Sequence, residues 1–181
     1  MSSLPTIDLE PFATRNRSRR STTACAERAP GRVLESRTMK AALLVESLTG
    51  NTWRAAELIA DDLGQEGWTI TGLSKVRQPD YASIQDADMV LVGTWVHGLI
   101  VVGVTPWALP AISQLPTMRG KRAAVFCTFA VNPRRSLERL TGAVEATGAT
   151  VVGGLALHRR KLARHAEEFA DRLVSATTTS S

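Results

Sequence analysis

The sequence has little of several features that would each point to a particular class of protein. It contains only two cysteines, Cys25 and Cys127, and no CxxC spacing, so neither a disulfide framework nor a cysteine-rich metal site is expected. The longest apolar candidate, residues 99–104, is far shorter than the roughly 20 residues that a membrane span needs. The first 38 residues lack the apolar stretch of a secretory signal. These absences favour a cytoplasmic protein with reduced thiols and no transmembrane segment.

Positive and negative charges nearly balance over most of the chain, although the formal net charge is +5. Residues 1–38 hold seven arginines and four acidic residues, whereas the remaining 143 residues carry a surplus of only +2. No basic stripe interleaved with aromatic residues is present, which argues against a nucleic-acid-binding core. Residues 1–38 are rich in Arg, Ser, Thr and Pro without periodicity, and are predicted to be a disordered basic extension. Because Met39 stands directly before the first predicted strand, a start-site artefact is the second interpretation.

The most informative segment present is a polar hexapeptide that follows an apolar run and opens an amphipathic helix. Its residues are Ser47, Leu48, Thr49, Gly50, Asn51 and Thr52. At such a strand-to-helix turn, the first backbone N–H groups of the helix have no intrahelical partner and the helix dipole is positive. Three hydroxyls around a glycine, without a lysine or the GxxxxGK[ST] spacing, favour a phosphate monoester over a nucleoside triphosphate. The plainer alternative is an ordinary helix cap, with Thr49 or Asn51 as the capping residue.

Strand and helix patterns alternate from residue 39 to residue 175, which defines one predicted domain followed by a disordered tail at 176–181. Strands are predicted at 40–46, 68–73, 88–94, 122–128 and 150–157. Helices are predicted at 51–65, 107–115, 136–147 and 162–175. Such alternation indicates an α/β, doubly wound, five-stranded parallel sheet with helices on both faces. In the order 2-1-3-4-5, the ligand site lies beyond the carboxyl ends of the first and third strands.

Two further loops at that edge are predicted to contact a ligand. The loop after the third strand contains Thr94, Trp95, Val96, His97 and Gly98, in which Trp95 can stack on a flat aromatic ligand. Trp95 as a hydrophobic plug and His97 as a solvated side chain are the alternatives. After the fourth strand, Thr128 and Asn132 can reach a ligand and Phe129 can pack beside it, whereas Cys127 is expected to be a core residue.

Two other segments have a plain interpretation and a functional one. Residues 99–104 are predicted to be a core or homodimer contact, and the alternative is an apolar lip for a hydrophobic substrate such as a quinone. Residues 158–161 read His-Arg-Arg-Lys, and Arg164 follows them. This basic cluster is predicted to be a solvated face, with a docking patch for an acidic partner as the alternative. No metal-ligand spacing and no catalytic residue is predicted from the sequence.

These residues together resemble the flavodoxin-like family. Its phosphate loop, [ST]-x-T-G-x-T, is matched at every specified position by residues 47–52, and residues 88–94 resemble the strand that leads into the flavin-covering loop. The resemblance covers residues 39–175 and is to the short-chain type. It implies FMN as cofactor, held by the hexapeptide, by residues 94–98 and by the loop after the fourth strand.

The resemblance implies a flavin redox protein, for which two versions are considered. One is an electron carrier with a redox partner protein, and the other is an FMN-dependent oxidoreductase of the quinone or protoporphyrinogen type. The core is mildly basic, whereas electron-transfer flavodoxins are typically acidic, and the loop at residues 128–132 departs from the family pattern. The alternative hypothesis is therefore a flavodoxin-like binding or interaction module that has lost FMN.

Overall fold

The computed structural model of the chain describes residues 38–96, 109–133 and 135–178, which form an α/β sandwich. Its strands are β1 (Lys40–Val45), β2 (Thr69–Lys75), β3 (Met89–Trp95), β4 (Arg122–Phe129) and β5 (Thr150–His158). Its helices are α1 (Asn51–Gln65), α2 (Tyr81–Asp86), α3 (Leu109–Ile112), α4 (Ser136–Glu145) and α5 (Leu162–Thr178). The strands pair in parallel in the order β2-β1-β3-β4-β5, so the predicted doubly wound sheet and its strand order are confirmed.

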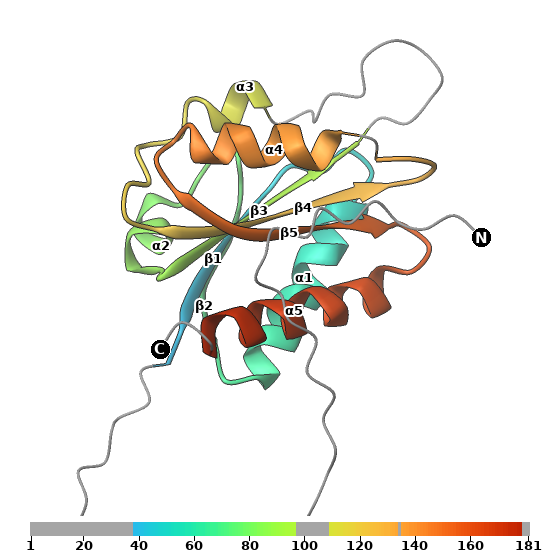
Figure 1. Cartoon of the computed structure of the whole chain (residues 1–181), viewed down its shortest axis with the longest axis horizontal. Helices are drawn as coiled ribbons and strands as arrows, with labels where there is room; N and C mark the ends of the chain where they lie inside the picture. Colours follow the sequence, from blue (N-terminus) through green and yellow to red (C-terminus); the bar gives the residue numbers. More distant parts are fainter. Residues whose placement is uncertain (1–37, 97–108, 134, 179–181) are drawn as a thin grey trace, which may run out of the picture.

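Helices cover both faces of the sheet, with α1 and α5 packed together on one face and α3 and α4 on the other (Figure 1). This explains why the central strands are apolar at successive positions rather than at alternate ones. In β3, Val90 and Val92 join the core on the α4 side, while Met89 and Leu91 join the core on the α1–α5 side. Because successive side chains of a strand point to opposite faces of the sheet, one apolar run contributes to both cores.

Close packing between β3 and β4 depends on a glycine near the carboxyl end of β3. Gly93 is paired with Phe126, and a Cβ added to Gly93 would lie 2.7 Å from Cε1 of the phenylalanine ring and closer still to Cζ. The ring of Phe126 occupies that space and also contacts Phe169 of α5, with the ring centroids 5.8 Å apart. An added methyl group at position 93 would therefore displace the contact between the sheet and α5.

One helix of the structure is not predicted by the sequence patterns. Helix α2 spans only Tyr81–Asp86, which is too short for a visible apolar repeat. Its start is nevertheless encoded locally, because the Asp80 carboxylate accepts hydrogen bonds from the backbone N–H groups of Ala82 and Ser83. An Asp followed by a short apolar helix was the signal that could have revealed it.

The remaining differences concern where helices begin and end. Within the predicted helix 107–115, residues 107 and 108 lie outside the described residues, and α3 covers Leu109–Ile112. Helix α4 ends at Glu145, two residues before the predicted end at 147. Helix α5 continues to Thr178, so residues 176–178 of the predicted disordered tail are helical, and Ala176 is 5% exposed. This helix continues because Ala176 lies three positions after the buried Leu173 and extends the same apolar face.

No helix among the described residues is long and apolar enough to cross a membrane. The predicted disordered extension, residues 1–38, lies outside the described residues except for Thr38. His97, Gly98 and the whole apolar segment 99–104 are outside them as well, so the expectations for these residues stay predictions.

Candidate functional site

The candidate site lies at the carboxyl end of the sheet, where the strand order reverses between β1 and β3. β1 lies between β2 and β3, so the strand order reverses at the β1–β3 pair, and α1 follows β1. The backbone N–H of Glu46 donates to the carbonyl oxygen of Gly93 over 2.9 Å, which joins the ends of the two strands. Open α/β sheets bind their ligands beyond the carboxyl ends of the strands, at the point where the strand order reverses.

The N-terminus of α1 has no side-chain cap. Gly50 is the residue before the helix, with a φ of 83° that side chains rarely allow, and no side chain accepts a capping hydrogen bond there. Instead, the Asn51 amide donates to the Thr49 hydroxyl over 2.9 Å. The alternative of an ordinary cap by Thr49 or Asn51 is therefore not what the structure contains. Since Glu and Asp are also absent from the first turn, the positive end of this helix is open to an anion.

A buried hydroxyl group lies directly before this helix start. Ser47 Oγ is inaccessible to solvent and has no hydrogen-bond partner among the described residues. Buried polar atoms without a partner are rare and costly, at about 1–3 kcal/mol each. Because Ser47 belongs to the loop that opens α1, a hydroxyl donor without a partner at this position fits an anion such as a phosphate group.

The negative charge closest in sequence to the loop belongs to Glu46, which the sequence patterns did not single out. Its side chain is 14% exposed, and Oε2 lies 3.7 Å from Nε of Arg77, a residue that follows β2. Arg77 therefore offsets a carboxylate that would otherwise disfavour an anion beside it. The signal in the sequence was the position of Glu46, which directly follows the last apolar residue of β1.

The hydroxyls of Thr52 and Thr128 are hydrogen-bonded to each other, with their oxygens 2.7 Å apart. Thr52 is completely buried in the first turn of α1, and Thr128 is 4% exposed in β4. The two predicted ligand contacts are thus neighbours across 76 positions of sequence. One hydroxyl donates to the other, so the accepting residue still has its own proton to donate. The bond fixes the start of α1 over the end of β4.

The end of β3 brings three predicted residues to the same edge. Thr94 is fully buried, Trp95 is partly exposed, and Val96 is 5% exposed. The backbone N–H of Val96 donates to the carbonyl oxygen of Thr128 over 2.9 Å, which ties the start of this loop to the end of β4. The position of Trp95 at the rim is compatible with stacking on a ligand and with the alternative of a plug.

The residues at the end of β4 are buried, whereas Asn132 in the following loop is exposed. Phe129 is 5% exposed and makes an edge-to-face contact with His158 at the end of β5, with ring centroids 5.2 Å apart. Asn132 is exposed in the following loop, whereas Cys127 is fully buried. Burial raises the pKa of the Cys127 thiol to about 12, so it is a core residue and not a nucleophile at neutral pH.

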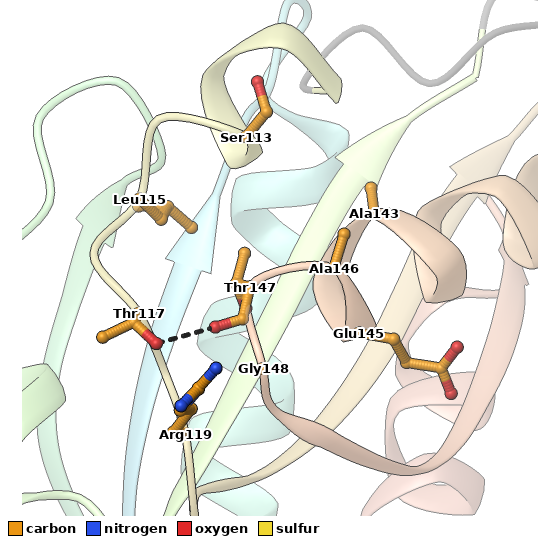
Figure 2. Close-up of a pocket in the computed structure, with 9 residues that line it drawn as sticks. All are labelled: Ser113, Leu115, Thr117, Arg119, Ala143, Glu145, Ala146, Thr147 and Gly148. Carbon is orange, nitrogen blue, oxygen red and sulfur yellow. Dashed lines mark hydrogen bonds between the residues drawn. The ribbon is translucent and has the colours of Figure 1, made fainter.

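A separate hollow of about 380 Å³ lies at the opposite end of the sheet. Figure 2 shows its lining, which comes from the segment between α3 and β4 and from the end of α4. Thr117 donates a hydrogen bond to the carbonyl oxygen of Thr147 in its wall, over 3.3 Å. The segments lining the hollow lead into the first residues of β4 and β5, and none of the predicted ligand contacts lines it. Among the described residues there is also no cluster of His, Cys, Asp or Glu that could hold a metal ion.

No protein-family model matches the sequence, and no curated protein matches it. Solved structures do match. Oxidised flavodoxin 1 from Bacillus cereus has a TM-score of 0.58 and 20% identity over 75% of this chain and 97% of its own. Two-electron reduced flavodoxin from Megasphaera elsdenii has a TM-score of 0.59 and 20% identity over 76% of this chain and 98% of its own.

The similarity extends to a protein in which this fold is one part of a longer chain. The flavodiiron core from Synechocystis sp. PCC6803 has a TM-score of 0.57 and 14% identity, and the match covers 80% of this chain and 37% of that one. At identities of 20% or less, these matches show the fold. The chain has the flavodoxin-like fold.

Proposed function

We propose that this chain binds FMN non-covalently at the β1–β3 edge and serves as a redox protein. The observation that carries the proposal is the α1 N-terminus, which no described side chain caps, together with the preceding Ser47 hydroxyl, which is buried and has no partner among the described residues. In the flavodoxin-like fold, a phosphate held there places the rest of a flavin mononucleotide over the ends of β1 and β3. The similarity to oxidised and reduced flavodoxins supports a redox role.

The phosphate would be held by neutral donors. The hydroxyls of Ser47, Thr49 and Thr52, the Asn51 amide and the first backbone N–H groups of α1 form this set, and Gly50 gives the loop its shape. A dianionic phosphate at a helix N-terminus is stabilised by the dipole without a paired cation. This fits a loop from which lysine and arginine are absent. Leu48 is 64% exposed and would contribute its backbone only.

The ring system would lie between the loops that follow β3 and β4. Trp95 is partly exposed at the end of β3, and the buried residues Thr94, Val96 and Thr128 lie at the same edge of the sheet. The bound flavin would supply the redox chemistry, while the protein orients it and sets the polarity around it. His97, Gly98 and Asn132 complete the set of proposed ring contacts.

The test is a visible spectrum of the purified protein, followed by titration of the flavin-free protein with FMN. We expect flavin absorbance and saturable binding at one site per chain. Ser47→Ala and Thr49→Ala should each weaken FMN binding by about 10- to 100-fold, since each removes a hydrogen bond to a charged group worth about 1.5–3 kcal/mol. Ser113→Ala, which removes an exposed hydroxyl directly after α3, is the matched control and should leave binding unchanged. No binding of added FMN would refute the proposal.

Two redox roles follow from the same site. A carrier passes electrons to a partner protein, whereas an oxidoreductase turns over a small acceptor such as a quinone. Steady-state reduction of a short-chain quinone by the FMN-loaded protein, at a rate above that of free FMN, would favour the enzyme. Electron exchange with proteins but no such turnover would favour the carrier.

A flavin-free interaction module is the second candidate, and the Thr52–Thr128 hydrogen bond favours it. Both hydroxyls have a structural partner within the chain, so their presence does not by itself require a ligand. In that case Thr49→Ala would leave every measurable function intact, and FMN would not bind.

A further inference from the structure

Five cationic side chains gather at one end of the sheet and define what we call the basic edge. They are Arg135, Arg159, Arg160, Lys161 and Arg164. All five residues are exposed. Arg135 directly precedes α4, and the other four lie in the turn after β5 and the first turn of α5.

The pairing of β4 with β5 brings these residues together. Phe129 and His158 are partners at the ends of the two strands, and the Arg159 N–H donates to the carbonyl oxygen of Phe129 over 3.0 Å. The turns after both strands therefore lie at the same end of the sheet, from which α4 and α5 start back (right in Figure 1). The loop after β1, which opens the proposed FMN site, leaves from this end as well.

The charge of the basic edge is not neutralised within the described part of the chain. Arg159, Arg160, Lys161 and Arg164 form no ion pair with any described residue, and the first turn of α5 contains no acidic residue. Arg135 has Glu138 at 3.9 Å, but both side chains are more than half exposed, so this pair contributes little. The positive ends of the α4 and α5 dipoles add to the same potential.

The acidic residues of the same layer lie further along the helices. Asp62 of α1 is near Asp61 on the same helix and near Glu167 and Asp171 of α5, and partial burial together with these like charges raises the pKa of Asp62. The α1–α5 layer is thus positive where α5 starts and negative along the two helices. A molecule with this separation of charge is oriented by the field of an oppositely charged surface before contact.

We infer that the basic edge is the docking surface for an acidic face of an electron-transfer partner protein. The role in electron transfer rests on the proposed FMN site, whereas the binding itself does not. Carboxylates on the partner would pair with the five cations while the FMN edge, which lies at the same end of the sheet, faces the partner's redox centre. Nucleic acid is the weaker fit because the cations occupy two short turns rather than a stripe, and the nearby Phe129 ring is buried against His158.

The test measures binding of the full chain to three probes. They are an acidic [2Fe–2S] electron-transfer protein, the basic protein cytochrome c, and a DNA duplex of about 20 base pairs. We expect the acidic protein to bind most tightly, with an affinity that falls about tenfold or more as salt screens the charges. Arg159→Glu combined with Arg160→Glu should weaken this binding at least about tenfold, and Arg159→Lys with Arg160→Lys should retain it.

The matched control is Arg119→Glu combined with Arg122→Glu, which changes the net charge equally. Arg119 precedes β4 and is exposed, and Arg122 begins β4 and is partly exposed, so both lie at the other end of the sheet. This variant should bind the acidic protein within about threefold of the parent chain. Equal loss in both double variants would show that only net charge matters and would overturn the inference.

Two other outcomes would also overturn it: tighter binding to cytochrome c than to the acidic protein, or tighter binding to the DNA duplex. Each measurement is made with and without FMN. Failure of the chain to take up FMN would refute the proposed function, but binding of the acidic protein that depends on Arg159 and Arg160 would still support the docking surface.

Discussion

Two threonine hydroxyls illustrate how single residues connect distant parts of this chain. Thr52 lies in the first turn of α1 and Thr128 near the end of β4, and each is almost completely buried. Their oxygens are 2.7 Å apart, so each hydroxyl has the other as its hydrogen-bond partner. Because a buried hydroxyl without a partner is more costly than no hydroxyl at all, the pair should behave as a unit.

A double-mutant cycle tests this unit. Thr52→Val or Thr128→Val alone should lower the free energy of unfolding by about 1–3 kcal/mol, since each leaves the other hydroxyl buried and unpaired. The double Val variant should be less destabilised than the sum of the two single variants, because both polar groups are then gone. Urea denaturation measures all four proteins. Strictly additive losses would show that the hydrogen bond contributes nothing to stability.

A buried histidine joins α5 to the end of β5. Nδ1 of His165 accepts a hydrogen bond from the His158 N–H over 3.0 Å, and the residue is 4% exposed. Burial lowers the pKa of His165 below its ordinary value of 6.5, and the positive charges of Lys161 and Arg164 act in the same direction, against the opposing effect of Glu168. The neutral imidazole is therefore the form that the folded protein holds.

Because of His165, the free energy of unfolding should decrease as the pH is lowered. As pH drops through about 6.5, the unfolded chain takes up a proton at His165 before the folded chain does, so protonation favours unfolding. The stabilisation is complete above that pH and is lost progressively toward the lower pKa of the folded state. His165→Asn, in which Oδ1 can accept from the His158 N–H, should reduce the slope of unfolding free energy between pH 7 and 5. An unchanged slope would contradict this assignment.

At the scale of elements, the start of α2 depends on local polar contacts more than on apolar pattern. Helix α2 has only six residues, and Asp80 accepts hydrogen bonds from two backbone N–H groups and from the Ser83 hydroxyl. These bonds lower the pKa of the Asp80 carboxyl, led by the bond from the Ser83 side chain. A short helix of this kind depends strongly on its first residue, because few hydrogen bonds lie within it.

Removal of this cap should therefore affect α2 before the rest of the fold. Asp80→Ala is expected to lower the urea midpoint and to increase amide hydrogen exchange in residues 81–86. Asp80→Asn keeps an accepting oxygen and should retain most of the protection. Since the folded pKa is lowered, the contribution of the carboxylate is present above its ordinary value of 3.8 and is lost as pH falls through the folded value. Equal exchange in all three proteins would contradict the role of the cap.

At the scale of the whole molecule, the described domain begins with Met39, which makes both a backbone hydrogen bond and core contacts. The carbonyl oxygen of Met39 accepts a hydrogen bond from the Thr69 N–H over 2.8 Å, which pairs the start of β1 with β2. Met39 also packs against the core on the α1–α5 side. Among the described residues, those that form the two cores on either side of the sheet all lie from position 39 onward.

A chain that begins at Met39 should therefore fold. We expect its Tm to lie within about 3 °C of that of the full chain, because changes outside the packed core usually cost less than about 0.5 kcal/mol. Its FMN affinity should also be unchanged. Calorimetry and an FMN titration of both chains provide the measurement. A large drop in Tm would show that residues 1–38 contribute to the domain and would refute the prediction that they are an extension.

Sequence patterns predicted most of this architecture because the apolar signals are strong and local. The bounds of α1 agree with prediction at both ends, and each strand agrees within two residues. Helix α2 was missed because six residues give no full repeat, and the end of α5 was placed too early because polar threonines hide the buried Ala176. In the candidate site, Glu46 and Arg77 were missed because their ion pair joins segments that are distant in sequence.

What the sequence determined by itself is local: where each strand and helix forms, and that a loop of hydroxyl residues around Gly50 opens the first helix. These follow from apolar spacing and from backbone groups that need partners within a few residues. Only the tertiary structure decided which side chains meet. It placed Thr52 on Thr128, buried Ser47 Oγ with no partner in the described part of the chain, and gathered Arg135 with Arg159–Lys161 into one basic edge. The reason is physical, because hydrogen bonds and charges act across a few ångströms, and only strand pairing brings residues so distant in sequence that close.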